Sequence, residues 1–189
     1  MLVLAYGFGL AVTSVSGALA FNGALTGSYS LSTQNLQTSF SIKVLGGSPI
    51  EGTFERVTGR VKLDSQRPER SKVEVSVDLT SVTTVNPKLA EFLKGQAMFN
   101  VNAHPKAHFE STRIELISSN TADAEGVLRL RGCEKRTSLR VHLADTSQRD
   151  LVTFEAQGAF FRSLYGMSVG QPIFGDNVSL KITGTGTRN

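Results

Sequence analysis

The 189 residues of this chain are 40% hydrophobic, and the mean hydropathy is −0.06. These values suit one folded domain with a sizeable core, and they exclude both a membrane protein and a disordered tail. The formal net charge is +4, and basic residues stand beside acids, as in residues 67–70 and 134–136. This interleaving argues against a nucleic-acid partner, which favours a contiguous basic face.

The first twenty residues carry no charge, and Leu2 to Val15 are mostly apolar. Residues 18–20 form the small-x-small pattern that signal peptidase accepts, and the run is too short and too rich in Gly, Ser and Thr to span a membrane. We therefore predict a signal peptide at 1–20 and a mature domain at 21–189. The alternative is a buried N-terminal strand, because an apolar run of this length is ambiguous.

The next segment, Phe21 to Thr38, is polar, contains several glycines and shows no helical periodicity. Downstream, apolar and polar residues alternate over Ser39–Val44, Arg60–Asp64 and Lys72–Leu79. Alternation of this kind predicts half-buried strands, and residues 46–49 (GGSP) form a turn after the first.

Between residues 86 and 98 the period changes. Asn86 suits a helix cap, Pro87 suits the first helical position, and Leu89, Phe92 and Leu93 fall on one face. We therefore predict one short helix over residues 87–94.

The two-residue period returns after the helix and continues to the end of the chain. The later alternating stretches are Ala107–Thr112, Arg113–Leu116, Leu128–Arg131, Leu139–Leu143, Phe154–Gln157 and Val178–Ile182. About eight half-buried strands at regular spacing predict a single domain that is a β-sandwich or a closed barrel.

Cysteine and histidine indicate no metal site. Cys133 is the only cysteine, so no intramolecular disulfide can form, and we expect it in a turn over residues 132–134. His104 and His108 are four apart, but Pro105 and the alternation make their segment extended, which separates them by roughly 13 Å. Two ligands of one zinc ion must each lie within about 2 Å of it. His142 falls on an outward, solvated face.

The sequence contains no recognisable catalytic motif. There is no Gly-x-Ser-x-Gly elbow, and residues 184–186 (GTG) follow the last strand with no helix behind them to form a phosphate cradle. We therefore predict that the protein is not an enzyme and uses no cofactor.

Four motifs, in the right order, resemble those of the YceI-like family. They are Gly52, Phe54, Val57 and Gly59; Phe99, Pro105, Phe109, Ser111 and Thr112; Gly126, Leu128, Leu130, Arg131 and Gly132; and residues 162–167 together with 175–178. The chain departs from the family pattern at Leu164, where the family has aspartate, at Tyr165, where it has phenylalanine, and at Arg136, where proline is common.

The resemblance implies an all-β fold, namely an antiparallel lipocalin-like barrel of about eight strands with one short helix. It also implies a periplasmic carrier or reservoir that holds a polyisoprenoid, a quinone-like molecule or another long lipid. A transient contact with a membrane or a membrane protein and a homodimer are open as further partners. The alternative is a filled barrel that acts as a structural or interaction module without a ligand.

Inward apolar side chains are the candidate lipid contacts, because an eight-stranded barrel is near the size at which the interior is either filled or holds one small ligand. For each of them the other interpretation is ordinary core. The candidates on the strands are Phe40, Ile42, Phe54, Val73, Val75, Val77, Phe109, Leu128, Leu130, Leu139, Val141, Phe154 and Ala156, and Phe92 and Phe99 are expected to form a lid.

Arg162 is the charged residue of most interest, because it opens the last family-like motif. We favour a role in locking a turn by hydrogen bonds to the backbone over a place at the mouth of the barrel.

Overall fold

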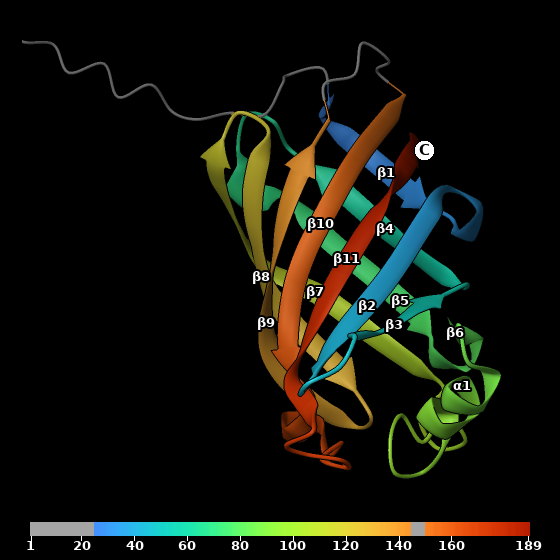
Figure 1. Cartoon of the computed structure of the whole chain (residues 1–189). Coiled ribbons are helices and arrows are strands. Elements are labelled where there is room, and N and C mark those ends of the chain that lie inside the picture. Colours follow the sequence, from blue (N-terminus) through green and yellow to red (C-terminus); the bar gives the residue numbers. More distant parts are fainter. Residues whose placement is uncertain (1–24, 145–149) are drawn as a thin grey trace, which may run out of the picture.

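The computed structural model describes residues 25–144 and 150–189. The predicted signal peptide at 1–20 therefore lies outside the described residues. The two ends of the described chain lie at the same end of the molecule (Figure 1), where the backbone amide of Asn189 donates to the carbonyl of Ser28 at 2.9 Å.

Eight antiparallel strands form a closed barrel, which confirms the predicted fold class. Strand β11 closes the sheet by pairing with β1, with Tyr29 opposite Arg188 and Ser30 opposite Thr187. In order round the barrel the strands are β1 (Gly27–Leu31), β4 (Val57–Leu63), β5 (Lys72–Asp78), β7 (Lys106–Ser118), β8 (Thr121–Leu130), β9 (Cys133–Leu143), β10 (Leu151–Phe161) and β11 (Phe174–Arg188).

Three further strands continue the sheet past a bend. They are β2 (Leu36–Val44), β3 (Ile50–Phe54) and β6 (Val82–Thr84), and the sheet runs from β11 through β2 and β3 to β6. The short 3-10 turns η2 (Thr33–Asn35) and η4 (Leu79–Ser81) make the bends between β1 and β2 and between β5 and β6. Each bend lets one stretch of chain serve both the barrel wall and its extension.

One ion pair joins the η4 bend to the connection between β3 and β4. The Asp78 side chain accepts hydrogen bonds from the Thr80 amide at 2.9 Å and from the Thr80 hydroxyl, and thereby caps η4. The same carboxylate accepts from Arg56 Nε at 2.9 Å, and Arg56 lies between β3 and β4. The bend and this connection are thus held in register.

The predicted helix is confirmed as α1 (Pro87–Lys94). The Asn86 side chain accepts from the Lys88 amide at 3.0 Å, and Pro87 occupies the first turn, where its missing N–H costs nothing. The helix packs against β6 and lies at the lower right of Figure 1. Within residues 25–144 and 150–189, no helix is long and apolar enough to cross a bilayer.

One strand was not predicted, and one sequence interpretation was wrong. The polar segment before Thr38 contains β1, since its outward serines and inward Tyr29 and Leu31 pair with β4. Cys133 is the first residue of β9, not part of a turn. The turn consists of Arg131 and Gly132, which both have positive φ, 52° and 75°.

The core lies inside the barrel. Apolar residues alternate inward along every long strand and form one connected cluster with the inward residues of α1. Two glycines make room for aromatic rings there. A Cβ on Gly52 would lie 2.5 Å from the ring of Phe40, and one on Gly126 would lie 2.7 Å from the ring of Phe109. These glycines of the family-like motifs therefore have a packing role.

Candidate functional site

Two apolar cavities lie end to end inside the barrel. The helix-side cavity has a volume of about 90 Å³ and reaches the end closed by α1, where Leu93, Met98 and Met167 line it. The far cavity has a volume of about 60 Å³ and lies nearer the chain termini, beside Leu63 and Val152. Because their walls are almost wholly hydrocarbon, both cavities suit an apolar occupant better than water.

Three side chains separate the two cavities. Val75 of β5, Leu139 of β9 and Ile182 of β11 line both of them, and we call these residues the waist. None of the three side chains has a polar atom. No side-chain hydrogen bond therefore has to break for the cavities to join.

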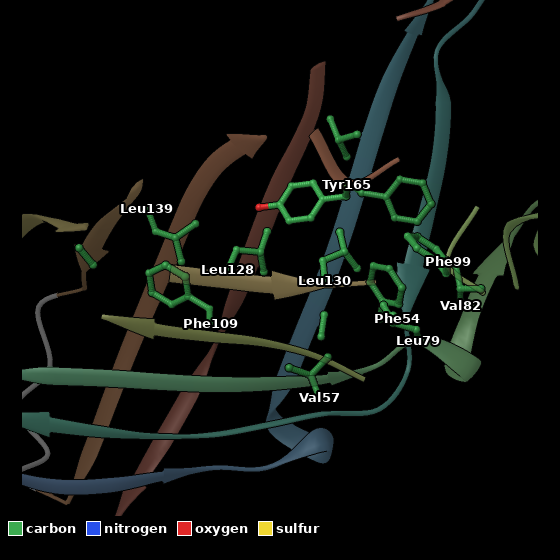
Figure 2. Close-up of a cluster of buried hydrophobic side chains, with 14 of the residues drawn as sticks. Phe54, Val57, Leu79, Val82, Phe99, Phe109, Leu128, Leu130, Leu139 and Tyr165 are labelled. Atoms are coloured by element: carbon green, nitrogen blue, oxygen red, sulfur yellow. The ribbon is translucent and has the colours of Figure 1, made fainter. Parts of the chain in front are cut away.

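The structure places the predicted lipid-contact residues on these cavity walls, with one exception. Val75 and Leu139 line both cavities. The others on the helix-side cavity are Phe40, Ile42, Phe54, Val77, Phe99, Phe109, Leu128 and Leu130, and those on the far cavity are Val73, Val141, Phe154 and Ala156. Figure 2 shows several of them, with Phe54 and Phe99 together near the helix end and Phe109, Leu128 and Leu139 further along.

The exception is Phe92, which lies on neither cavity wall, so its place in a lid stays a prediction. Its side chain is 46% exposed and lines neither cavity. The buried residues of α1 are Ala90 and Leu93. Residues two apart on a helix point about 200° apart, so a face centred near Ala90 and Leu93 leaves Phe92 outside.

Several wall residues come from irregular elements and were not among the predicted lipid contacts. Leu79 lies in η4, Met98 follows α1, and Met167 follows η5 (Arg162–Tyr165). Leu93 could have been selected, because it stands three residues after Ala90 on one helical face. The sequence around the two methionines carries no periodic signal that could have identified them.

Two hydroxyl groups add polarity to the interior. Thr38 Oγ1 and Tyr165 Oη are buried and make no hydrogen bond of good geometry in the described part of the chain. Thr38 lines the helix-side cavity. Burial raises the pKa of Tyr165, and the neighbouring Thr137 hydroxyl partly opposes that shift. Figure 2 shows the Tyr165 hydroxyl pointing toward Leu128 and Leu139. Of the two groups only the Thr38 hydroxyl lies on a cavity wall, where it can donate to an oxygen of a bound molecule.

Arg162 locks the connection between β10 and β11, as the sequence favoured. Its side chain is only 1% exposed. Nε donates to the Gly175 carbonyl at 3.0 Å, and the terminal nitrogens donate to the carbonyls of Met167, Val169 and Phe174. Burial lowers the pKa of Arg162, and the charge of Asp176 opposes the shift. The guanidinium also borders the helix-side cavity, so one group shapes both the loop and that end of the interior.

Arg131 joins two connections at the same end of the barrel. Its guanidinium donates to the carbonyls of Tyr165 at 3.1 Å and Gly166 at 3.3 Å, and also to the Gln96 carbonyl at 3.0 Å. Gly166 has a φ of 75°, and a Cβ there would overlap the Arg131 guanidinium. The segment after α1 and the loop around η5 are thus tied together over the helix-side cavity.

Residues 25–144 and 150–189 contain no group of three His, Cys, Asp or Glu side chains that could hold a metal ion. His108 points outward from β7, and His104 precedes that strand. The exposed His142 lies beside the Thr121 hydroxyl at 3.1 Å.

A larger hollow, of about 600 Å³, lies on the outer face of the sheet extension. Six of its thirteen lining residues bear hydroxyl groups, among them Ser39, Ser41, Thr53 and Thr83, and Lys181 and Glu51 are charged. Thr53 and Thr83 are hydrogen-bonded to each other at 2.8 Å. This mixed lining suits an apolar chain less well than the almost wholly hydrocarbon interior, so the barrel interior is the stronger candidate site.

Comparison with known proteins agrees with the geometry. Residues 29–185 match the model of the YceI-like domain. This chain belongs to the YceI-like family. A UPF0312 protein of Ectopseudomonas mendocina is 33% identical over 128 residues, which are 67% of this chain and 67% of that protein.

Two solved structures share the YceI-like fold. BcnA of Burkholderia cenocepacia superposes with a TM-score of 0.74 at 22% identity, over 80% of this chain and 96% of that chain. A polyisoprenoid binding domain from Saccharophagus degradans, implicated in plant cell wall breakdown, has a TM-score of 0.68 at 10% identity. That match covers 87% of this chain and 99% of the domain.

Proposed function

We propose that this YceI-like chain binds a long apolar lipid of the polyisoprenoid or quinone type inside its barrel and acts as a periplasmic carrier or reservoir. The observation that carries the proposal is the pair of apolar cavities lying end to end, separated only by the hydrocarbon side chains of Val75, Leu139 and Ile182. An extended chain fits such a path. The proposal involves neither a catalytic step nor a cofactor.

The fold neighbour from Saccharophagus degradans supports the lipid class, because it is described as a polyisoprenoid binding domain. The energetics also support it, since each buried CH₂ contributes about 0.8 kcal/mol. A few isoprene units therefore supply substantial affinity without a charged anchor. The Thr38 hydroxyl, on the wall of the helix-side cavity, suits an oxygen-bearing group such as a quinone carbonyl.

The cavity volumes favour a second candidate, a filled barrel that acts as a structural or interaction module. Cavities of about 90 and 60 Å³ are smaller than the few hundred Å³ typical of ligand sites. A lipid-loaded barrel must therefore differ from this one by movement of side chains, chiefly at the waist. The carrier needs an interior that can open around a lipid, whereas the filled barrel needs an interior that stays packed. One experiment therefore separates the two candidates.

The test is purification of the full-length product from its native envelope under non-denaturing conditions, followed by organic extraction and mass spectrometry. The carrier proposal expects a prenyl lipid in the extract at a constant ratio to protein. A matched sample, stripped of lipid and incubated with polyprenol or ubiquinone, should take it up again. An empty extract together with no uptake would reject the carrier and favour the filled barrel.

Export is part of the same proposal. It rests on the uncharged, apolar residues 1–20 and their small-x-small ending. The intact mass of protein recovered from the native envelope should correspond to a chain that begins at or near Phe21. Recovery of the full-length chain from the cytoplasm alone would contradict export.

A further inference from the structure

An apolar tip occupies the end of the barrel that α1 also closes. It consists of large hydrophobic side chains that are 38% to 77% exposed. They come from the β2–β3 connection and from the end of β10, the loop after it and the start of β11, which form the projecting blue and red segments at the bottom of Figure 1. The members of the apolar tip are Leu45, Phe161, Leu164, Val169, Ile173 and Phe174.

The two connections that form the tip contain no charged residue except Arg162, whose side chain is buried. Residues 45–49 (LGGSP) and 163–175 (SLYGMSVGQPIFG) lack Asp, Glu, Lys and Arg, although 19% of the whole chain is charged. Exposed connections are normally polar, and a contiguous exposed apolar patch marks an interaction site.

Hydrogen bonds hold the backbone of the tip on both connections. The Arg162 guanidinium binds the carbonyls of Val169 and Phe174 from inside. The Leu45 amide donates to the Ile173 carbonyl at 2.9 Å, which joins the two connections. The exposed apolar surface is therefore a preformed feature, not a loop caught in one conformation.

Several basic residues lie on the elements next to the tip. Lys43 precedes the β2–β3 connection and its backbone lies beside Gly175, and Lys135 and Arg136 follow the turn from which Arg131 reaches the loop. Lys88 is exposed on the first turn of α1.

Two of the acidic side chains at the same end are paired with basic ones. Glu134 pairs with Arg129, Glu91 pairs with Lys94, and Asp176 accepts from Ser163. Glu51, on β3, faces the outer hollow. The net charge at this end of the barrel is therefore positive.

The tip is continuous with the helix-side cavity. Met167, in the loop that carries Leu164 and Val169, lines that cavity from within, and Arg162 borders it. The outer side of this one loop is thus exposed and apolar, while its inner side forms part of the cavity wall.

We propose that the apolar tip docks into the surface of a bilayer containing anionic lipid. Hydrophobic side chains on two projecting connections suit insertion among lipid headgroups, and the lysines on the neighbouring elements suit negative headgroups. The docking would place the helix-side cavity directly against the membrane. It extends the proposed lipid-carrier role, but the surface and its test do not depend on a lipid inside the barrel.

Tryptophan fluorescence tests the docking, because the chain contains no tryptophan. Two variants of the lipid-stripped mature chain are compared, Ile173→Trp at the tip and Ile117→Trp at the opposite end of the barrel. The two isoleucines are similarly exposed, 56% and 50%. With vesicles of phosphatidylglycerol and phosphatidylethanolamine, the emission of the Ile173→Trp variant should shift to the blue, and that of the Ile117→Trp variant should not.

Vesicle sedimentation gives the second measurement. The double variant Leu164→Ser and Ile173→Ser should lose about tenfold or more of the vesicle partitioning, while Ile117→Ser should keep it. High salt and vesicles without phosphatidylglycerol should also weaken binding. None of these three residues lines either cavity, so uptake of a prenyl lipid should persist in all variants.

The possible results are distinguishable. Loss of vesicle binding with retained lipid uptake supports the tip. The docking proposal is overturned if vesicles bind without a blue shift at position 173. It is also overturned if the Leu164→Ser and Ile173→Ser double variant binds vesicles as well as the parent chain. If the parent chain does not bind vesicles at all, the proposal is wrong, and the tip must be covered by a protein instead. Absence of lipid uptake in the parent chain rejects the carrier role and leaves the docking result intact.

Discussion

Arg162 shows how one buried side chain can organise an entire connection. A guanidinium carries its donors in a fixed planar fork, and here they reach carbonyls on both sides of the loop, at Met167 and Val169 and at Phe174 and Gly175. Lysine could not reproduce this arrangement, because its donors radiate from a single nitrogen. The conformation of the loop therefore depends on the planar geometry of the guanidinium group as much as on its charge.

Replacement of Arg162 should therefore be costly. Arg162→Ala leaves several buried carbonyls without donors, and since each costs about 1–3 kcal/mol, we expect a loss of about 3 kcal/mol or more in the free energy of unfolding measured in urea. Arg162→Lys should recover only part of this. The control is Arg113→Ala on the exposed face, which should change stability by less than about 0.5 kcal/mol. A loss below about 1 kcal/mol in Arg162→Ala would contradict the locking role.

The Asp78 carboxylate makes stability depend on pH. Burial raises its pKa, but the hydrogen bonds from Thr80 and Arg56 outweigh burial and hold the pKa below its usual range. A carboxyl group with a lowered folded-state pKa stabilises the protein above its unfolded pKa of about 3.9, and this contribution is lost as the pH falls through the folded value.

We therefore expect Asp78→Asn to be less stable than the parent at pH 7, and the difference to shrink as the pH falls below about 4. Urea unfolding at a series of pH values measures this difference. Ser76→Ala, on the same strand, should show no such trend. A difference that stayed constant from pH 7 to pH 3 would mean that Asp78 acts through packing alone.

Among the elements, α1 shows most clearly how packing selects one face. The helix begins where its cap and proline predict, yet its buried side is set by contact with β6 and the helix-side cavity. Leu93 therefore lies in the core, and Phe92 lies at the surface despite its larger hydrophobic side chain.

Substitutions on the two sides of α1 should differ accordingly. Leu93→Ala should cost about 2–5 kcal/mol, because it removes a fully buried side chain and enlarges the cavity. Phe92→Ala should cost less than about 1 kcal/mol, since much of the ring already contacts water. Thermal or urea unfolding provides the measurement. Equal losses of stability in the two variants would show that the helix buries Phe92 as well as Leu93.

At the scale of the whole molecule, the barrel interior is a path with one narrow point. The waist residues come from strands distributed round the barrel and meet near its middle. The size of these side chains sets whether the two cavities act as one or as two. For a bound lipid, the waist therefore determines how long a prenyl chain the barrel can hold.

Changes at Val75 in opposite directions should have opposite effects on a bound lipid. Val75→Phe should exclude the longest prenyl chains, and Val75→Ala should admit them more readily, as measured by mass spectrometry after uptake from a mixture of chain lengths. In a filled barrel, Val75→Phe would instead overpack the core and cost about 1–3 kcal/mol without altering any lipid profile. The same uptake profile in both variants would reject the waist as a length determinant.

The sequence alone determined the features that depend on near neighbours in the chain. Alternation predicted which side chains face inward, because successive residues of a strand point to opposite faces whatever the partner strand is. Asn86 and Pro87 predicted the start of α1, because capping involves only the next few residues. The motifs around Gly52 and Gly126 identified the family before any contact was known.

Only the tertiary structure decided which of these segments meet. Closure joins Tyr29 to Arg188 across nearly the whole chain, and the waist brings together Val75, Leu139 and Ile182. The apolar tip likewise joins Leu45 to the loop around Ile173. These contacts depend on long-range strand pairing and on the curvature of the closed sheet. Local periodicity carries no information about either, because it records which way a side chain points and not what it meets there.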